Sequence, residues 1–429
     1  MAVLIPLASL LVFLLSGAAI AYVVGGASVL AFVVSDNARY LAILPQRMFS
    51  QIDVFALMAM PLFIMTGEIM NRSGITKALI DFAMALVGRF KGGLGHVNIM
   101  TSVFFAGISG SAIADSAALS NTLVPAMREQ GYTAVYAGAI TAASSIIGPI
   151  IPPSIILIVY GALMETSIAA LFIAGIVPGL VLALGLFIVN AFLAHRDDHP
   201  GGREAELPAL VPSFIKAAPA LSLPLIIVGG IVVGWVTPTE AAAIAVFTAA
   251  GVGTLYGRMN AAVFWQSAQH TARITGSVFI ILCAVAALGY LAGLLQWPQT
   301  LAGWVSGAGL TGLQYILVLN VIFLVAGMIM EIPVALTLLV PILAPIALAQ
   351  GVNPVHLGIV LCFNLCIGLV TPPLGGCLIV VSTITKVNYW ALARAVMPFI
   401  AVEIAILALI ILVPELSLSL PRLAGFTVN

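Results

Sequence analysis

Apolar blocks separated by short polar interruptions occupy almost the whole of this chain. About 20 apolar residues are enough for a helix to cross a bilayer, so we expect about ten to fourteen spans or half-spans. We expect the first segment, Val3 to Val24, to be a retained helix rather than a cleaved signal peptide, because no basic stretch precedes it. The blocks run approximately over 3–34, 52–70, 78–88, 97–127, 134–163, 167–194, 216–235, 239–256, 275–295, 314–349, 355–385 and 391–414.

The longest polar interruption lies near the middle of the chain, at 195–204, and combines charged residues with Pro and Gly. Such a composition is typical of a solvent-exposed loop. We therefore divide the chain into a first half over 1–195, a polar linker over 196–215 and a second half over 216–429. The basic residues of the short loops show too weak an asymmetry for the positive-inside rule to assign an orientation.

Several apolar blocks contain residues that a simple transmembrane helix does not tolerate. The block at 97–127 contains a Gly-Ile-Ser-Gly-Ser run, and the sequence Pro-Pro occurs at 152–153 and again at 372–373. Proline removes a backbone donor and clashes with the preceding turn, so helices must break at both Pro-Pro pairs. Irregular backbone at membrane depth is tolerated only where it is buried in protein or lines a cavity. These segments are therefore predicted to be broken helices or re-entrant hairpins.

The second half repeats part of the first, as an alignment of 106–159 with 326–379 reveals. Of the 54 ungapped pairs, 13 are identical, and many of the identical residues are Gly or Pro. Composition alone would give about 4 identities. Two repeats with broken helices at corresponding positions are typical of a transporter binding site, and an odd number of crossings in each half would make them inverted. The repeat predicts hairpins at about 97–127 and 314–349, and broken helices at about 134–163 and 355–385.

Composition narrows the class of protein. The chain is 62% hydrophobic and only 7% charged, against roughly 25% charged residues in ordinary soluble domains. It is therefore an integral, all-α membrane protein, and its zero net charge offers no footprint for nucleic acid. The histidines are scattered, and the Gly-x-Ser-x-Gly, Walker and His-Glu-x-x-His motifs are absent, so we expect no enzyme activity.

Oxygen-rich backbone at the breaks suggests cation binding. Sodium prefers hard oxygen ligands, and unwound carbonyls supply them without burying a net charge. One cage is predicted from 109–111 with 148–153, and a second from 327–331 with 368–376. The same glycines could instead serve close helix packing, with the serines bonded to their own helices. Asp115 lies six residues after Ser109 in an apolar stretch, and Glu331 is aligned with Ser111 in the repeat; intramembrane acids are expensive enough to suggest function.

The motifs at 107–115 (Gly-Ile-Ser-Gly-Ser-Ala-Ile-Ala-Asp) and 147–154 (Ile-Gly-Pro-Ile-Ile-Pro-Pro-Ser) resemble a known family. They are similar to the large membrane (M) subunit of tripartite ATP-independent periplasmic (TRAP) transporters, in its dicarboxylate-permease branch. The resemblance extends over nearly the whole chain through 61–74, 236–241 and 368–375. It implies an elevator-type importer of organic acids in the bacterial inner membrane. It also implies that a sodium gradient drives transport. The implied partners are a separate small membrane (Q) subunit and a periplasmic substrate-binding (P) protein.

The resemblance also implies a set of site residues and two coupling sodium ions. The hairpin tips and broken helices would hold sodium, and hydroxyls and half-helix N-termini would meet the substrate carboxylate. The implied substrate contacts are Asp115, Ser116, Ser145, Asn364 and Thr371. The implied sodium ligands are Ser109, Gly110, Ser111, Gly148, Ile151, Pro153, Gly327, Glu331, Gly368, Thr371, Pro372 and Gly376.

One motif keeps an alternative open. Ser-Asn-Thr at 120–122 matches a motif of divalent-anion/sodium symporters, which work without a binding protein. That family carries the motif in both repeats, whereas the counterpart here is Val-Pro-Ile at 340–342. A passive channel would show flux without sodium coupling, and a scaffold subunit would not need two repeated helix breaks. The sequence does not name the organic acid.

Overall fold

The structure is a computed structural model that describes residues 12–13, 17–107, 109–201 and 207–428. Within these residues the regular structure is helical, apart from one isolated bridge between Lys91 and Gly201. The expectation of an all-helical membrane protein is therefore confirmed. Most of the helix predicted over 3–24 lies outside the described residues, and α2 covers Ile20–Val34.

The helices of the first half are α2, η1 (Ala38–Ile43), α3 (Leu44–Ile52), η2 (Phe55–Met58), α4 (Ala59–Arg72), α5 (Ile75–Val87), α6 (Gly93–Ala106), α7 (Ala112–Glu129), α8 (Ala134–Ser145), α9 (Ile155–Leu163) and α10 (Ile168–Arg196). Those of the second half are α11 (Leu210–Val232), α12 (Pro238–Leu255), α13 (Ala261–Leu294), α14 (Trp297–Gly307), α15 (Gly312–Ile329), α16 (Ile332–Ala349), α17 (Pro354–Gly368), α18 (Gly376–Thr385), α19 (Tyr389–Leu412) and α20 (Glu415–Leu423).

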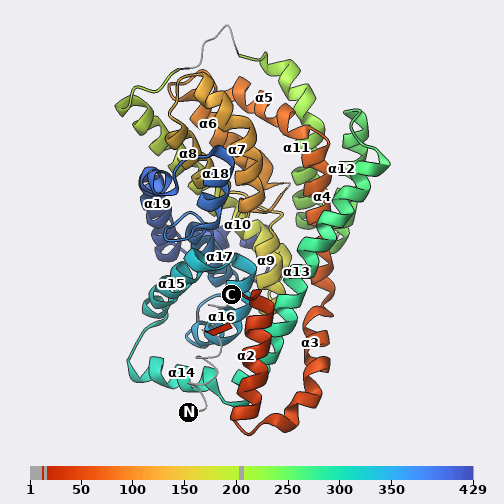
Figure 1. The fold of residues 1–429 in the computed structure, drawn as a ribbon, viewed down its shortest axis with the longest axis vertical. Coiled ribbons are helices and arrows are strands. Elements are labelled where there is room, and N and C mark those ends of the chain that lie inside the picture. The colour runs from red at the N-terminus through yellow and green to blue at the C-terminus, as the bar shows by residue number, and fades with distance from the viewer. Residues whose placement is uncertain (1–11, 14–16, 108, 202–206, 429) are drawn as a thin grey trace.

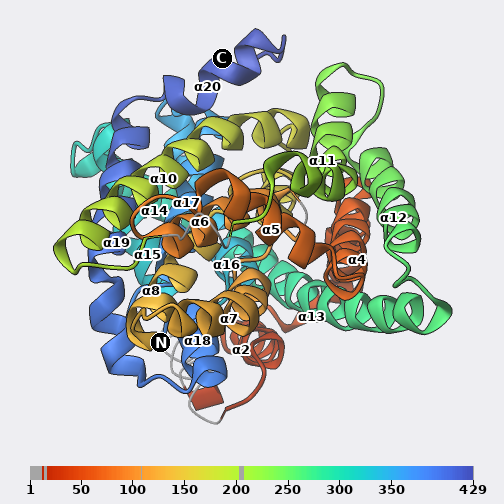
Figure 2. The same ribbon diagram turned by 90° about the horizontal axis from the view of Figure 1, so that it is seen from above.

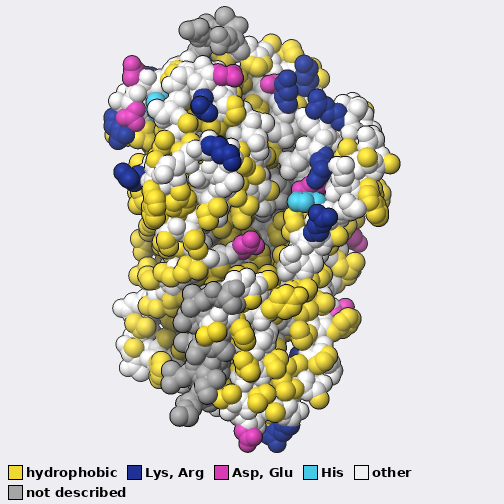
Figure 3. All heavy atoms as spheres, in the orientation of Figure 1, with side chains coloured by type: hydrophobic (Ala, Val, Ile, Leu, Met, Phe, Trp, Pro, Cys, Tyr) yellow, Lys and Arg dark blue, Asp and Glu magenta, His cyan; other side chains and the backbone are white. Residues whose placement is uncertain are grey.

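Seven helices in the described chain are long and apolar enough to cross a membrane, or eight if the segment 38–72, bent by 60°, counts as one span. On α10, Leu184, Ile188 and Phe192 are exposed and recur every fourth residue. This spacing puts them on one helix face, as expected of side chains that meet lipid. Figure 3 shows apolar side chains around the middle of the molecule and most of the charged ones toward its upper end.

Two helix pairs enter the molecule from opposite ends (Figure 1). The pair α6–α7 has its base at the upper end, where the Gly92 N–H bonds to the Pro200 carbonyl. The pair α15–α16 has its base at the lower end, beside α14. Their tips, at 109–111 and 330–331, lie near the middle of the molecule.

The helix boundaries recur between the two halves. α7 and α16 begin at 112 and 332 and end at 129 and 349, and α8 and α17 begin at 134 and 354. The alignment of the repeated sequences pairs each of these boundaries with its counterpart. Helices are interrupted at both Pro-Pro pairs, between α8 and α9 and between α17 and α18, because proline cannot continue the backbone ladder.

Two groups of helices are visible when the molecule is seen from above (Figure 2). One side holds α4, α11 and α12, in which α12 packs on both of the others, and α13 runs along the molecule from this group toward α2. The other side holds both helix pairs together with α8, α10, α17, α18 and α19.

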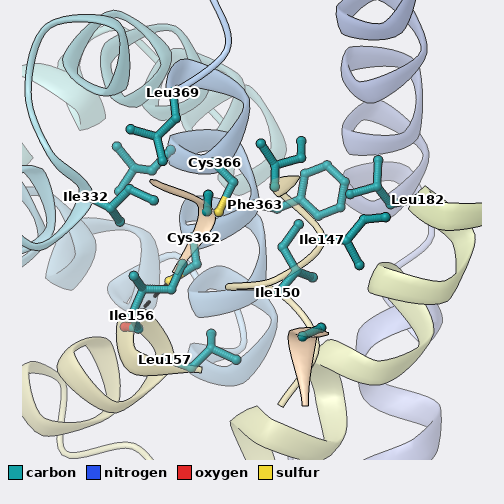
Figure 4. Close-up of a cluster of buried hydrophobic side chains, with 14 of the residues drawn as sticks. Ile147, Ile150, Ile156, Leu157, Leu182, Ile332, Cys362, Phe363, Cys366 and Leu369 are labelled. Carbon is teal, nitrogen blue, oxygen red and sulfur yellow. Dashed lines mark hydrogen bonds between the residues drawn. The ribbon is translucent and has the colours of Figure 1, made fainter. Parts of the chain in front are cut away.

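The apolar core of the second group surrounds the helix interruptions (Figure 4). Ile147 and Ile150 come from the first interruption, Leu369 from the second, and Phe363 from α17, and all four are buried. Close packing of this kind holds the irregular backbone in one conformation.

Candidate functional site

The first hairpin tip and the first helix break meet through a buried carboxylate. The Ser109 hydroxyl donates a hydrogen bond to Oδ1 of Asp115, which is 1% exposed. The other carboxylate oxygen lies against Gly148, where an added β-carbon would fall 2.3 Å from Oδ2. A β-carbon on Gly110 would fall 2.9 Å from the Pro153 carbonyl oxygen. The structure therefore brings together five residues predicted for this site.

Local sequence explains how this tip is formed. Gly110 has a φ of +59°, a left-handed conformation that glycine adopts without the cost of a β-carbon. Ser111 then caps α7, because its hydroxyl accepts a hydrogen bond from the Ala114 N–H at 3.4 Å. Ser154 caps α9 in the same way, accepting from the Leu157 N–H at 3.3 Å. Both helices thus begin at the site.

The second hairpin and the second break make a glycine-to-glycine contact. A β-carbon on Gly368 would fall 2.5 Å from the carbonyl carbon of Gly327, so only glycine allows the two backbones to approach this closely. The Gly375 N–H donates to the Met328 carbonyl at 3.4 Å. A β-carbon on Gly375 would lie 3.1 Å from the Thr371 carbonyl oxygen. Backbone oxygens from both segments are therefore concentrated here.

A cavity of about 130 Å³ lies between the two tips, α9 and α13. The first residues of three helices line it: Ala112 on α7, Ile155 on α9 and Ile332 on α16. Helix N-termini carry unpaired N–H groups and a positive partial charge, so they attract anions. The only charged side chain among the described lining residues is Glu331, which is exposed. Helix dipoles are thus the source of positive charge around this cavity.

The predicted sodium ligands are distributed unevenly over these features. Gly110, Ser111 and Glu331 line the central cavity, whereas Gly148 and Gly368 are buried at the two breaks. Glu331 therefore faces open space and is not part of the glycine contact. Ile151 directs its side chain toward Gly179 on α10.

The predicted substrate contacts are not among the residues that line the cavity. Asp115, Ser116, Ser145 and Asn364 are buried, and Thr371 is half-buried. The Ser116 and Ser145 hydroxyls donate to backbone carbonyls of their own helices, at 2.9 and 2.8 Å. Thr371 does the same toward Ile367 at 2.7 Å. In this conformation these groups lie behind the cavity wall.

Two buried oxygens without a hydrogen-bond partner among the described residues test whether cations fit these breaks. Oδ2 of Asp115 and Oδ1 of Asn364 are buried and have no hydrogen-bond partner among the described residues. A buried oxygen without a partner is costly, and a bound cation would satisfy it. The groups shown at the two breaks are carboxylate, amide and backbone carbonyl oxygens, which are hard ligands. Such oxygens suit an alkali or alkaline-earth ion.

Sequence reasoning missed a buried polar connection in each half. Asn98 on α6 donates to Thr141 on α8 at 2.6 Å and accepts from Ser144 at 3.0 Å. In the second half, Asn364 on α17 donates to the Asn320 side chain on α15 at 2.5 Å. Ser144 and Asn364 are aligned with each other in the repeated sequences, so their equivalence was a signal that could have been used. Each connection joins the first helix of a hairpin to the following broken helix.

Comparison with known families matches residues 7–416 to the tripartite ATP-independent periplasmic transporter, DctM component. The chain is 38% identical over 395 residues to the sialic acid TRAP transporter large permease protein SiaM of Vibrio cholerae, covering 92% of each chain. It is 36% identical over 406 residues to the isethionate TRAP transporter permease protein DctMQ of Oleidesulfovibrio alaskensis. That match covers 94% of this chain and 64% of the relative.

Among solved structures, the fold is similar to that of the YdaH transporter of Alcanivorax borkumensis. The TM-score is 0.62 at 15% sequence identity, and the match covers 91% of this chain and 89% of the other. At this identity the similarity concerns the fold alone. It agrees with the helical membrane architecture described above.

Proposed function

This chain belongs to the DctM-component family of tripartite ATP-independent periplasmic transporters, and from this premise we propose that it imports an organic acid by sodium symport. The observation that carries the proposal is the central cavity, which is lined by three helix N-termini and flanked by two oxygen-rich breaks. Membership of the family makes the chain a multi-pass transporter permease and not an enzyme.

Sodium coupling is supported by the two breaks. At the first, the uncompensated Asp115 oxygen lies beside Gly148, and the Pro153 carbonyl lies beside the hairpin tip. At the second, Gly327 and Gly368 approach each other, and the Thr371 carbonyl lies beside Gly375. We infer one sodium ion at each break. A cation bound there would order a hairpin tip and lend positive charge to the cavity between them.

An organic anion is the substrate class that this cavity favours. Its walls are apolar, and the N–H groups at the starts of α7, α9 and α16 can bind a carboxylate. The names of relatives mention sialic acid and isethionate, which are both organic acids. The half-buried Thr371 and the buried Ser116, Ser145 and Asn364 would contribute only after the hairpin tips move apart.

The family is tripartite, so we propose two protein partners. One is a small membrane subunit, and this chain covers 64% of a relative whose name, DctMQ, joins two components in one permease. The other is a periplasmic protein that delivers the substrate. Together with these partners, the protein would work in the inner membrane of a bacterium.

The arrangement of the helices supports inverted repeats and an elevator-type movement. The two helix pairs open toward opposite ends of the molecule, and their helix boundaries recur at equivalent positions of the repeat (Figure 1). The group around α4, α11 and α12 would form the static part, and the group around the two breaks would move (Figure 2). Arg89 and Lys91 lie in the loop between α5 and α6, at the end of the molecule where the pair α6–α7 has its base, so we propose that this end is cytoplasmic (Figure 1).

Uptake into proteoliposomes tests this proposal. The chain and its small membrane partner would be reconstituted, and uptake of a panel of labelled organic acids measured with and without a sodium gradient and the loaded periplasmic protein. We expect uptake of one acid to require both. Sodium-driven uptake without the periplasmic protein would favour a stand-alone divalent-anion symporter, and flux without sodium coupling would indicate a passive channel.

A further inference from the structure

A second cavity, on the lower part of α13, holds a single positive charge. It has a volume of about 340 Å³ and lies between α3, α9, α13 and α16. Its polar lining includes Arg47, Ser50 and Gln51, which lie within about one turn of α3, and the rest of the lining is mostly apolar. No acidic side chain is among the described residues that line it.

The guanidinium of Arg47 is held against an aromatic ring, and its charge is not neutralised by an acidic side chain of the described chain. Its guanidinium lies 4.8 Å from the ring centroid of Tyr290 on α13, an arrangement that attracts a cation to the aromatic face. Within the described chain it forms no ion pair with an acidic side chain. The spacing of Arg47, Ser50 and Gln51 places them on one helix face. A charged guanidinium with a neighbouring hydroxyl and amide is suited to binding an organic anion.

This cavity continues the interface along which the central cavity lies. The central cavity is lined by Val278 on α13 and Pro333 on α16, and the second is lined by Leu282 and Thr337. These residues are four positions further along each helix, which is about one helical turn. An anion that moves along the α13–α16 interface from the lower end would therefore meet Arg47 before it meets the hairpin tips.

We propose that this second cavity is an entry subsite, in which Arg47 holds the carboxylate of the incoming organic acid before it reaches the central cavity. The inference rests on the proposed transport function. It assigns Arg47 a role in capturing the anion. It therefore predicts that Arg47→Lys keeps this role and that Arg47→Gln loses it. Since Arg47 and Ser50 are both exposed, variants at these positions should fold normally.

Charge-selective labelling tests the potential in the cavity without measuring transport. Ser50→Cys would be made in a Cys283→Ala background, because Cys283 is partly buried and the other three cysteines are buried. The rates of reaction with a negatively charged and a positively charged methanethiosulfonate reagent would then be compared. We expect Arg47→Gln to lower the ratio of the rate with the negative reagent to the rate with the positive reagent about tenfold, and Arg47→Lys to preserve this ratio. The transported acid should slow labelling in the Arg47 protein.

Transport kinetics provide the second arm of the test. With limiting loaded periplasmic protein, Arg47→Gln should reduce initial uptake about fivefold, equivalent to about 1 kcal/mol, because a charge-assisted hydrogen bond to the anion is lost. Saturating protein should restore most of the rate. Normal uptake by Arg47→Gln, or labelling that no transported acid slows, would overturn the entry subsite. Protection by phosphatidylglycerol alone would assign the cavity to a lipid headgroup and also overturn it. Absence of sodium-dependent uptake in the unmodified protein would instead refute the proposed function, since the labelling ratio does not depend on transport.

Discussion

The free carboxylate oxygen of Asp115 lies so close to Gly148 that a β-carbon on this glycine would fall 2.3 Å from it. The contact joins a hairpin to a helix break that is well separated from it along the chain, at what we propose to be a sodium site. It also leaves no room for any side chain larger than hydrogen at position 148.

Gly148→Ala should therefore reduce sodium-dependent uptake by about tenfold or more, because the new methyl group displaces the carboxylate by about an ångström. Gly276→Ala is the matched control, since nothing lies within 4 Å of the β-carbon it would add on α13. Both variants would be compared at equal amounts of reconstituted protein. Equal uptake by the Gly148→Ala and Gly276→Ala proteins would contradict the site.

Asp115→Asn tests the charge of the same site. The substitution keeps an oxygen that can accept from the Ser109 hydroxyl but removes the negative charge. We expect the sodium concentration for half-maximal uptake to rise about tenfold, equivalent to about 1.4 kcal/mol of binding free energy. The measurement is the sodium dependence of initial uptake at saturating substrate. An unchanged half-maximal concentration would show that Asp115 has a structural role only.

The Asn320–Asn364 hydrogen bond should contribute to stability. Asn364→Leu would leave the Asn320 side-chain oxygen buried without this donor, at a cost of about 1–3 kcal/mol. The Asn320→Leu/Asn364→Leu double variant should lose less than the sum of the two single losses, because both polar partners are gone. Thermal unfolding in detergent measures each value. Additive losses would mean that the two residues act independently.

Glu403 is a fully buried carboxyl group whose two oxygens have no hydrogen-bond partner among the described residues. Burying an unpaired polar group costs folding free energy, so Glu403→Leu should raise the midpoint of thermal unfolding by about 2–4 °C. Glu415→Leu serves as a control because that side chain is exposed and paired with Arg422. A clear loss of stability in Glu403→Leu would reveal a partner for this carboxyl group.

The linker between the halves should loosen on acidification. His199 packs against Tyr136 with ring centroids 4.1 Å apart, and burial lowers its pKa, outweighing the opposing effect of Asp197. A lowered pKa in the folded state means that the packing of the linker on the first half, through His199, is favoured when His199 is neutral. The stabilisation of the linker by His199 is therefore complete above the ordinary pKa of about 6.5 and is lost as the pH falls below it.

Hydrogen exchange of the Gly92 N–H, which donates to the Pro200 carbonyl at 3.1 Å, reports on this attachment. After correction for the intrinsic exchange rate, protection should decrease between pH 7.5 and 5.5 and should be independent of pH in His199→Gln. The neighbouring Asp198–Lys91 ion pair cannot explain such a change, because Lys91 lowers the pKa of Asp198 below its ordinary value. The same pH dependence in His199→Gln would refute the assignment.

Much of the fold could be predicted because proline and glycine act locally. The Pro-Pro pairs at 152–153 and 372–373 interrupt helices in any packing environment, and the internal repeat locates corresponding elements. Whether a side chain is buried depends on distant elements and could not be predicted in this way. Asp115 and Glu331 both looked like intramembrane acids, yet the first is buried against Gly148 and the second is exposed at the central cavity.

The polar connections and the Arg47 cavity lay beyond sequence reasoning for the same reason. Asn98 gives no local sign that it will meet Thr141, because the contact exists only after α6 packs on α8. Arg47 resembles an ordinary loop cation until α3 is placed beside Tyr290 on α13. The individual sodium and substrate ligands remain predictions derived from the motifs.

Simultaneous measurement of labelled sodium and labelled organic acid entering the same proteoliposomes tests the central claim most directly. We predict that both enter only when the loaded periplasmic protein is present, with about two sodium ions for each acid, one for each break. Gly148→Ala should lower the sodium flux and the acid flux together and to the same extent. Import of the acid without any accompanying sodium would contradict the account.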